Sequence, residues 1–415
     1  MLSKLRIQNF KSIGSPLEIH PRSLTLLLGP NGSGKSSILE ALCVVSQSVG
    51  QMELQHSGEL VRYDSLLSLI HRRDMNRYVS FELGVRPELE ELVNSRFLKS
   101  FDMRSDPVAS YRWRMQPFEA AQSVYLEGNE VARVRFSGET GSRMESPVSA
   151  GTRVDARHLF APQCFDLGNP NDRISVAAQE LMQIVSANIR QTLFLSAVRG
   201  DSTTYLDAQT GRDPQWVGPR GEYTPHVMAK FFALRENEER QKLIVKWAER
   251  LGLNLLKAGW PGGNRIDSDY MDPILKTFVR APLASYGARQ ALAIITQLFA
   301  SPPGSILLIE EPEISLHPES QMLLPELFAE AVQRGVQLLI TTHSIFLPLS
   351  LWRPISQKLL AHDDIAVYHT VKTEEGTQAE EIPLTEEGFL QSWIPSFSQA
   401  EEKAIRDFLK VVPKK

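Results

Sequence analysis

Near the N-terminus, apolar residues first alternate with polar residues and then form a short continuous run. Leu5, Ile7 and Phe10 nearly alternate with polar residues, which predicts a first strand, and Leu17–Ile19 predicts a second. Leu24–Leu28 is a continuous apolar run, as expected for a strand buried on both faces. Apolar positions with helical spacing follow between residues 38 and 45. The sequence therefore predicts a strand, a glycine-containing loop and a helix near the N-terminus.

The middle of the chain has a different pattern. Strands are predicted at Tyr78–Val85, Ser123–Leu126 and Val131–Phe136, with a hairpin turn at Gly128-Asn129. Ser, Gly and charged residues dominate Ser137–Asp155, which predicts a mobile loop. This part is expected to form an antiparallel lobe over residues 51–165.

Residues 166–282 are expected to form a mainly helical lobe. Helical spacing covers 174–191 and most of 225–258, and Leu193–Ala197 predicts a short strand between them. Polar, glycine-containing sequence fills residues 201–222.

From residue 283 the pattern of strands alternating with helices resumes. Helices are predicted at 287–300, near 318–334, after residue 343 and near 399–411, and strands at 305–309, 336–340, 365–370 and 379–384. Such alternation predicts a parallel sheet covered by helices. The fold class is therefore α/β, with residues 1–50 and 283–415 forming a core that is split in sequence.

Composition narrows the class of protein. The chain has 415 residues, 42% of them hydrophobic and 23% charged, as in a globular protein. Its two cysteines, Cys43 and Cys164, fit a reducing compartment better than a disulfide framework. A membrane span needs roughly 18 apolar residues in a row, and no run is that long. We expect a cytoplasmic protein without a membrane partner. The net charge of −4 argues against a protein that coats nucleic acid by bulk electrostatics.

The loop after the run at Leu24–Leu28 matches the pattern G-x-x-x-x-G-K-S. Its residues are Gly29, Pro30, Asn31, Gly32, Ser33, Gly34, Lys35 and Ser36, followed by Ser37. Glycines let successive backbone N–H groups and the helix N-terminus approach a phosphate. Lys35 would contact the β- and γ-phosphates, and Ser36 would bind Mg²⁺. The predicted cofactors are therefore ATP and Mg²⁺.

Two later predicted strands are followed by side chains that can bind a metal ion or orient a water molecule. Ile306–Ile309 is followed by Glu310 and Glu311, and the second apolar strand is followed by His343. Phosphoryl transfer depends on placement and electrostatics, so we expect Glu310 to hold magnesium and Glu311 to orient the attacking water. His343 is expected to hydrogen-bond the γ-phosphate or that water.

These three motifs, in this order, resemble the ABC-type P-loop ATPases, which include transporter heads, SMC proteins, RecF and the OLD family. The stretch Glu310–Pro318 is especially similar to the soluble branch called AAA family ATPases. The resemblance implies a P-loop head with a mostly parallel core sheet, an antiparallel β layer and helical insertions. It also implies a signature motif at Leu283–Gln290, in which Ser285 and Gly287 contact the ATP of a second copy, so that the protein forms an ATP-dependent homodimer, and a higher oligomer is open. Tyr286 and Ala288 depart from the transporter form of this motif.

The resemblance further implies a glutamine that contacts Mg²⁺ or water, for which Gln47 is preferred over Gln51 and Gln55. Arg199 is expected either to supply charge to a phosphate or partner, or to form a surface salt bridge. Residues 71–77 and 111–114 mix cations with an aromatic, which is typical of a solvated strand face and also of a nucleic-acid contact.

The function expected from this resemblance is an ATPase that couples ATP turnover to DNA repair or antiphage defence, together with DNA or RNA and a separate nuclease or effector protein. No Toprim-type acidic cluster follows residue 350 and no long heptad run is present, so neither an OLD-type nuclease nor an SMC arm is expected in this chain. The alternative is an ATP-gated scaffold with little hydrolysis. A transporter head is disfavoured by the long insertions between residues 50 and 280.

Overall fold

The protein is described by a computed structural model. The residues that the structure describes are 1–51, 54–87, 106, 108–115, 119–126, 129–137, 141–145, 173–200, 216–262, 265–272, 274–392 and 394.

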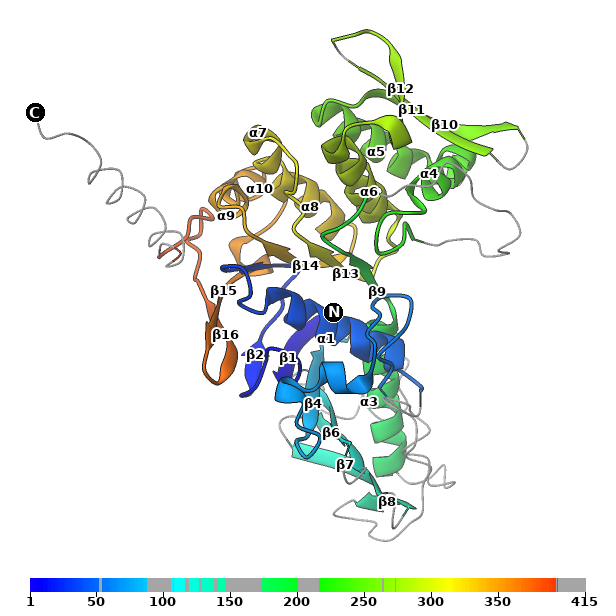
Figure 1. Ribbon diagram of the computed structural model, residues 1–415. Helices are drawn as coiled ribbons and strands as arrows, with labels where there is room; N and C mark the ends of the chain where they lie inside the picture. Colours follow the sequence, from blue (N-terminus) through cyan, green and yellow to red (C-terminus); the bar gives the residue numbers. More distant parts are fainter. Residues whose placement is uncertain are drawn as a thin grey trace, which may run out of the picture.

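A six-stranded sheet forms the centre of the molecule (Figure 1). Five neighbouring strands are parallel, and the strand at one edge is antiparallel to them. In spatial order the strands are β16 (Gly376–Glu381), β15 (Ile365–Thr373), β3 (Leu24–Leu28), β14 (Gln337–Thr342), β13 (Ile306–Glu310) and β9 (Thr192–Leu195). The parallel arrangement brings the ends of β3, β13 and β14 to one edge, where the three motifs lie.

Alternating side chains of these strands enter two separate hydrophobic cores. Leu27, Leu308 and Leu339 pack with α1 (Lys35–Ser48) and α3 (Arg173–Arg190) in one core. Their neighbours in the strands pack on the opposite side with α6 (Tyr286–Ala300) and α8 (Leu324–Val332). Burial on both faces explains why these strands are continuous apolar runs in the sequence.

A seven-stranded antiparallel sheet extends from this core and packs against α3 (Figure 1). Its spatial order is β2 (Leu17–Ile19), β1 (Leu2–Gln8), β4 (Val79–Val85), β5 (Val108–Arg114), β6 (Glu119–Leu126), β7 (Asn129–Ser137) and β8 (Gly141–Glu145). In these strands other than β8, the buried apolar residues belong to the same core as α1 and α3, and polar residues occupy the other face. The two N-terminal strands therefore belong to the antiparallel sheet and not to the parallel core.

A second lobe lies on the opposite side of the parallel sheet (Figure 1). It contains α4 (Thr224–Ala233), α5 (Glu238–Arg250) and a three-stranded sheet of β10 (Asn254–Gly262), β11 (Arg265–Met271) and β12 (Phe278–Arg280). The short helices α7 (Pro318–Gln321), α9 (Phe346–Leu349) and α10 (Trp352–Ser356) complete the described part of the core.

Three sequence predictions differ from these elements. The loop expected over 137–155 includes β8, because a polar strand at the edge of a sheet has no apolar alternation to reveal it. The mainly helical prediction for 166–282 missed the sheet of β10–β12. The single helix expected near 318–334 is divided into α7 and α8. The helix expected near 399–411 lies outside the described residues.

Among the residues that the structure describes, every helix is too short or too polar to cross a bilayer.

Candidate functional site

The phosphate-binding loop connects β3 to α1 as the sequence predicts. Gly29, Gly32 and Gly34 have φ values of 154°, 74° and 98°. Residues other than glycine rarely adopt such positive φ values. A Cβ atom on Gly29 would lie 2.4 Å from the carbonyl oxygen of Thr370, and one on Gly34 would lie 1.9 Å from Oγ1 of Thr377. The hairpin of β15 and β16 therefore packs directly behind this loop, and two of its glycines are required for that packing.

Ser33 in the motif and Ser37 after it are both hydrogen-bonded within the protein. The hydroxyl groups of Ser33 and Thr370 are 2.7 Å apart, and those of Ser37 and Ser12 are 2.9 Å apart. Their side chains are thus engaged within the protein. The expected contacts of Asn31, Ser33 and Ser37 with phosphate stay predictions.

Lys35 folds back over the loop. Its Nζ donates hydrogen bonds to the carbonyl oxygens of Gly29 at 2.8 Å and Pro30 at 3.1 Å. The residue is 5% exposed, and this burial lowers the pKa of its ammonium group to about 8, although nearby Glu311 and Glu313 act in the opposite direction. A buried cation held only by carbonyl oxygens is poised to contact an anion.

Glu310 ends β13 beside the first residues of α1. Its carboxylate is hydrogen-bonded to the Ser36 hydroxyl and accepts the Ala197 N–H at 3.2 Å. Burial, and in lesser part repulsion from Glu40 and Glu311, raises the pKa of Glu310. A desolvated carboxylate and a hydroxyl in contact are hard oxygen donors of the kind that Mg²⁺ prefers, so the residues present fit this ion.

Glu311 turns away from the strand. Its φ is +43° and its N–H donates to the Thr341 carbonyl oxygen at 2.8 Å. This turn places Oε1 of Glu311 3.6 Å from Nε2 of His343, and both side chains are about one-third exposed. Burial and the charge of Lys35 lower the pKa of His343, so that its imidazole is neutral at pH 7.

Glu313 is a further residue of the site whose role the sequence did not reveal. Its Oε1 accepts the backbone N–H groups of His343 at 2.7 Å and Ser344 at 3.1 Å, and the residue is buried. Glu313 thereby fixes the loop that carries His343. Its position two residues after Glu311 was visible in the motif, but the motif did not show what it contacts.

Arg199 corrects a prediction. It is fully buried, and its guanidinium donates to the carbonyl oxygens of Ser196 at 2.7 Å, Glu310 at 2.5 Å and Glu311 at 2.7 Å. Burial lowers its pKa to about 10. It is therefore neither a surface salt bridge nor a free cation for a partner. Arg199 therefore fixes the backbone of Glu310 and Glu311.

Gln47 has partners that the sequence did not predict. Its amide nitrogen donates to the carbonyl oxygen of Gln55 at 2.6 Å, and its amide oxygen accepts the N–H of Val61 at 3.3 Å. In this structure Gln47 fastens the loop that follows α1. A contact of Gln47 with magnesium stays a prediction and would require this amide to change partners.

The signature segment begins α6 as expected. The Ser285 hydroxyl caps the helix and accepts the Ala288 N–H at 3.3 Å. A Cβ atom on Gly287 would lie 2.4 Å from the carbonyl oxygen of Ser315, so the turn packs closely on the segment after the acidic pair. The neighbouring Leu283 and Tyr286 are 75% and 38% exposed. The start of this turn is therefore exposed to solvent.

Two family models match the chain. Residues 190–350 match a model described as "AAA domain, putative AbiEii toxin, Type IV TA system", and residues 4–92 match one described as "AAA domain". No curated protein matches the chain.

Solved structures of SMC heads resemble the chain over almost its whole length. A crystal structure of an SMC head bound to the C-terminal winged-helix domain of ScpA has 15% identity and a TM-score of 0.50, and the match covers 92% of this chain and 98% of that one. The SMC head domain from Thermotoga maritima has 12% identity and a TM-score of 0.42, covering 92% and 99%. An SMC head derived from Pyrococcus furiosus, with an extended coiled coil and the C-terminal domain of ScpA, has 11% identity and a TM-score of 0.48, covering 98% and 99%. The first of these shows that the fold is shared. The chain therefore has the P-loop ABC-ATPase fold of an SMC head, and two parts of it match models of AAA domains.

Proposed function

We propose that the protein binds ATP-Mg²⁺ and hydrolyses it in sites completed by a second copy of the chain. The observation that carries this proposal is the convergence of Lys35, the Ser36–Glu310 pair and the Glu311–His343 pair at one edge of the parallel sheet. Each pair joins residues from different strands or loops, as a phosphoryl-transfer site requires.

Each residue has a role that follows from its position. The Lys35 ammonium would leave the carbonyl oxygens of Gly29 and Pro30 for the β- and γ-phosphates. Ser36 and Glu310 would hold magnesium, which would supply positive charge to offset that of the phosphates. Glu311 would accept a hydrogen bond from the attacking water and orient it for in-line attack. Neutral His343 would hydrogen-bond the γ-phosphate beside it.

The second copy would supply its signature turn. Ser285 and Gly287 lie at the N-terminus of α6, where backbone N–H groups and the helix dipole favour an anion. Exposed Leu283 and Tyr286 beside them, and exposed Val198 near the acidic edge, are apolar surface that a head-to-tail dimer would cover. Release of phosphate would remove the contact shared by both chains and loosen the dimer.

We further propose that this cycle controls an effector or acts on nucleic acid, as in DNA repair or antiphage defence. The description of one matching family model as a toxin of a toxin–antitoxin system supports an effector-related task. A separate nuclease or other effector that co-purifies with the protein in an ATP-dependent manner is the expected partner.

A second candidate function is an ATP-gated scaffold that hydrolyses little ATP. Tyr286 and Ala288 in the signature segment favour it, because their side chains alter the surface that meets the γ-phosphate of the other copy. The two functions share ATP binding and differ only in turnover.

Phosphate release by the wild-type protein and by Glu311→Gln distinguishes them. Hydrolysis is supported if the wild type releases phosphate at least tenfold faster than Glu311→Gln while both bind ATP with similar affinity. Equal, background-level release by two proteins that bind ATP would favour the scaffold.

A further inference from the structure

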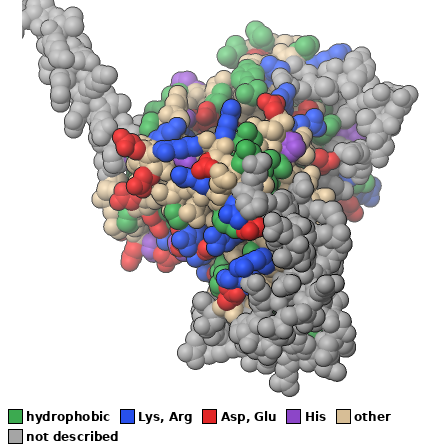
Figure 2. All heavy atoms as spheres, turned by 60° about the horizontal axis from the view of Figure 1, so that its bottom comes forward, with side chains coloured by type: hydrophobic (Ala, Val, Ile, Leu, Met, Phe, Trp, Pro, Cys, Tyr) green, Lys and Arg blue, Asp and Glu red, His purple; other side chains and the backbone are tan. Residues whose placement is uncertain are grey.

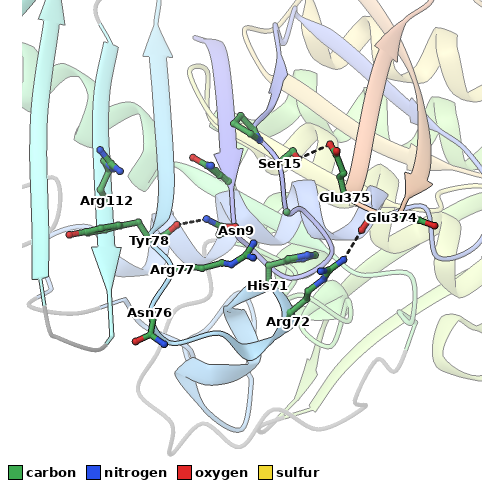
Figure 3. A pocket seen from close by; sticks show the side chains of 13 residues that line it. Asn9, Ser15, His71, Arg72, Asn76, Arg77, Tyr78, Arg112, Glu374 and Glu375 are labelled. Atoms are coloured by element: carbon green, nitrogen blue, oxygen red, sulfur yellow. Dashed lines mark hydrogen bonds between the residues drawn. The ribbon is translucent and has the colours of Figure 1, made fainter.

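A polar pocket of about 660 Å³ lies outside the nucleotide site, between the antiparallel sheet and the tip of the β15–β16 hairpin (Figure 3). Its lining includes Arg72, Arg77 and Arg112, together with the amide side chains of Asn9 and Asn76. These residues come from segments that are far apart in sequence. The fold therefore joins the two basic–aromatic patches, 71–77 and 111–114, that the sequence showed only separately.

This pocket continues into a second depression on the polar face of the antiparallel sheet. Gln8 and Arg112 line both, and the second adds Arg6, Arg133 and Arg135. Together the two depressions carry six arginines against Glu82, Glu374 and Glu375. We call this continuous surface the arginine track. Figure 2 shows Lys and Arg side chains gathered on this underside of the molecule, with acidic side chains between them.

The cations of the arginine track are not equally neutralised. Arg133 is paired with Glu130 at 2.6 Å and Arg77 with Asp74 at 3.0 Å. Within the described residues, Arg72 and Arg112 form no ion pair with a carboxylate. Arg72 donates to the backbone carbonyl oxygen of Glu374 at 2.7 Å, and the Arg112 guanidinium carbon lies 4.9 Å from the centre of the Tyr78 ring. These two exposed guanidinium groups are available to an anion.

We propose that the arginine track binds a single strand of nucleic acid through its phosphates. Arginine, amide and hydroxyl donors match a phosphodiester backbone, and the two depressions are also lined by Tyr78 and Tyr125, side chains of the kind on which bases stack. Two adjoining depressions on the face of a sheet fit a flexible strand better than a rigid duplex. The cations are local, so the net charge of −4 does not oppose binding at this face.

The pocket is also lined by the tip of the β15–β16 hairpin, which packs behind the phosphate-binding loop. Two hydrogen bonds hold the hairpin tip. Arg72 donates to the backbone carbonyl oxygen of Glu374, and the Ser15 hydroxyl donates to the Glu375 carboxylate at 3.2 Å. Two residues past this tip, Thr377 donates a hydrogen bond to the Ser12 hydroxyl at 2.8 Å, and that hydroxyl is hydrogen-bonded to Ser37 on α1. A phosphate that competes for Arg72 would alter this chain of contacts. This coupling rests on the proposed ATPase function, whereas strand binding does not.

Fluorescence anisotropy with labelled single-stranded DNA and RNA, without nucleotide, tests the binding. We expect Arg72→Ala and Arg112→Glu to weaken binding at least tenfold. Removal of one arginine that binds a phosphate should also reduce the slope of log affinity against log salt by about 0.7. Arg235→Ala is the matched control, because Arg235 is exposed on the opposite lobe, and it should bind as the wild type does. Thermal melting should show that all three variants fold.

Wild-type affinity in both folded track variants would overturn the proposal. Equal or tighter binding of a duplex, or of a polyglutamate peptide, would overturn the assignment to a single strand. Lys35→Ala should keep strand binding, because the arginine track lies outside the nucleotide site. A wild-type protein that binds the strand but hydrolyses no ATP would overturn the proposed function alone. The coupling predicts that the strand changes ATP turnover at least twofold in the wild type and not in Arg112→Glu; an unchanged wild-type rate with bound strand contradicts it.

Discussion

The Nε2 atom of His343 lies 3.6 Å from Oε1 of Glu311. The two residues follow neighbouring parallel strands, β14 and β13, whose register pairs Glu310 with Thr341. Glu313 fixes the loop of the histidine from one side, and Arg199 fixes the backbone of the acidic pair from the other. A carboxylate and a neutral imidazole are thus held at a distance at which one water molecule can contact both.

His343→Ala should lower kcat for ATP hydrolysis by about 10²-fold, because a preorganised donor to the transferring phosphate is removed. Affinity for ATP should change by only a few-fold, since Lys35 and the phosphate-binding loop remain. Steady-state phosphate release gives kcat, and equilibrium binding of a fluorescent ATP analogue gives the affinity. A large loss of affinity with an unchanged kcat would contradict the assigned role.

ATP binding should take up a proton near pH 8. Lys35 has a pKa of about 8 in this structure, so roughly half of the molecules carry a neutral amine at that pH, and a polyphosphate favours the charged form. Affinity should therefore be greatest below pH 8 and fall as the pH rises above it. Calorimetry at pH 8 in buffers of different ionisation enthalpy measures the uptake. Lys35→Arg, which stays protonated, is the control and should show none from this position.

Arg199→Lys should lower thermal stability and kcat together. A lysine cannot reproduce the planar fork that contacts the carbonyl oxygens of Ser196, Glu310 and Glu311, and a buried acceptor left unpaired costs about 1–3 kcal/mol. Differential scanning calorimetry measures the first effect. A folded variant with wild-type kcat at low temperature would show that Arg199 stabilises the fold without positioning the acidic pair.

Gly34→Ala should abolish ATP binding. An alanine at this position would have a strained backbone at φ +98°, and its Cβ atom would lie 1.9 Å from Oγ1 of Thr377. Thr377→Ala removes only a hydroxyl and should keep affinity within a few-fold. If the double variant Gly34→Ala/Thr377→Ala regains more binding than the single glycine variant, the clash matters; if it regains none, backbone strain alone explains the loss.

The parallel core and the motifs it carries could be predicted because both follow from local sequence. Leu24–Leu28 is a strand with the predicted bounds, and the helix that follows begins at Lys35. Burial on two faces leaves a strong apolar signal, and the motif residues lie at strand ends by chain order alone.

Contacts between distant segments could not be predicted in this way. Arg199 was expected either to supply charge to a phosphate or partner or to form a surface salt bridge, whereas it is buried and donates to three backbone carbonyl oxygens. The support of Gly34 by Thr377 joins residues more than 300 positions apart. Strands such as β8 at the polar edge of a sheet carry no periodic apolar signal.

The central claim is that ATP joins two copies of the chain through the signature turn of each. The most direct test is the solution mass of Glu311→Gln, measured by light scattering with and without ATP-Mg²⁺, beside Glu311→Gln/Ser285→Arg. We predict a 46.7 kDa monomer without nucleotide, twice that mass with ATP-Mg²⁺, and a monomer under both conditions for the double variant. An unchanged mass for Glu311→Gln saturated with ATP-Mg²⁺, or an equally stable dimer of the double variant, would contradict the account.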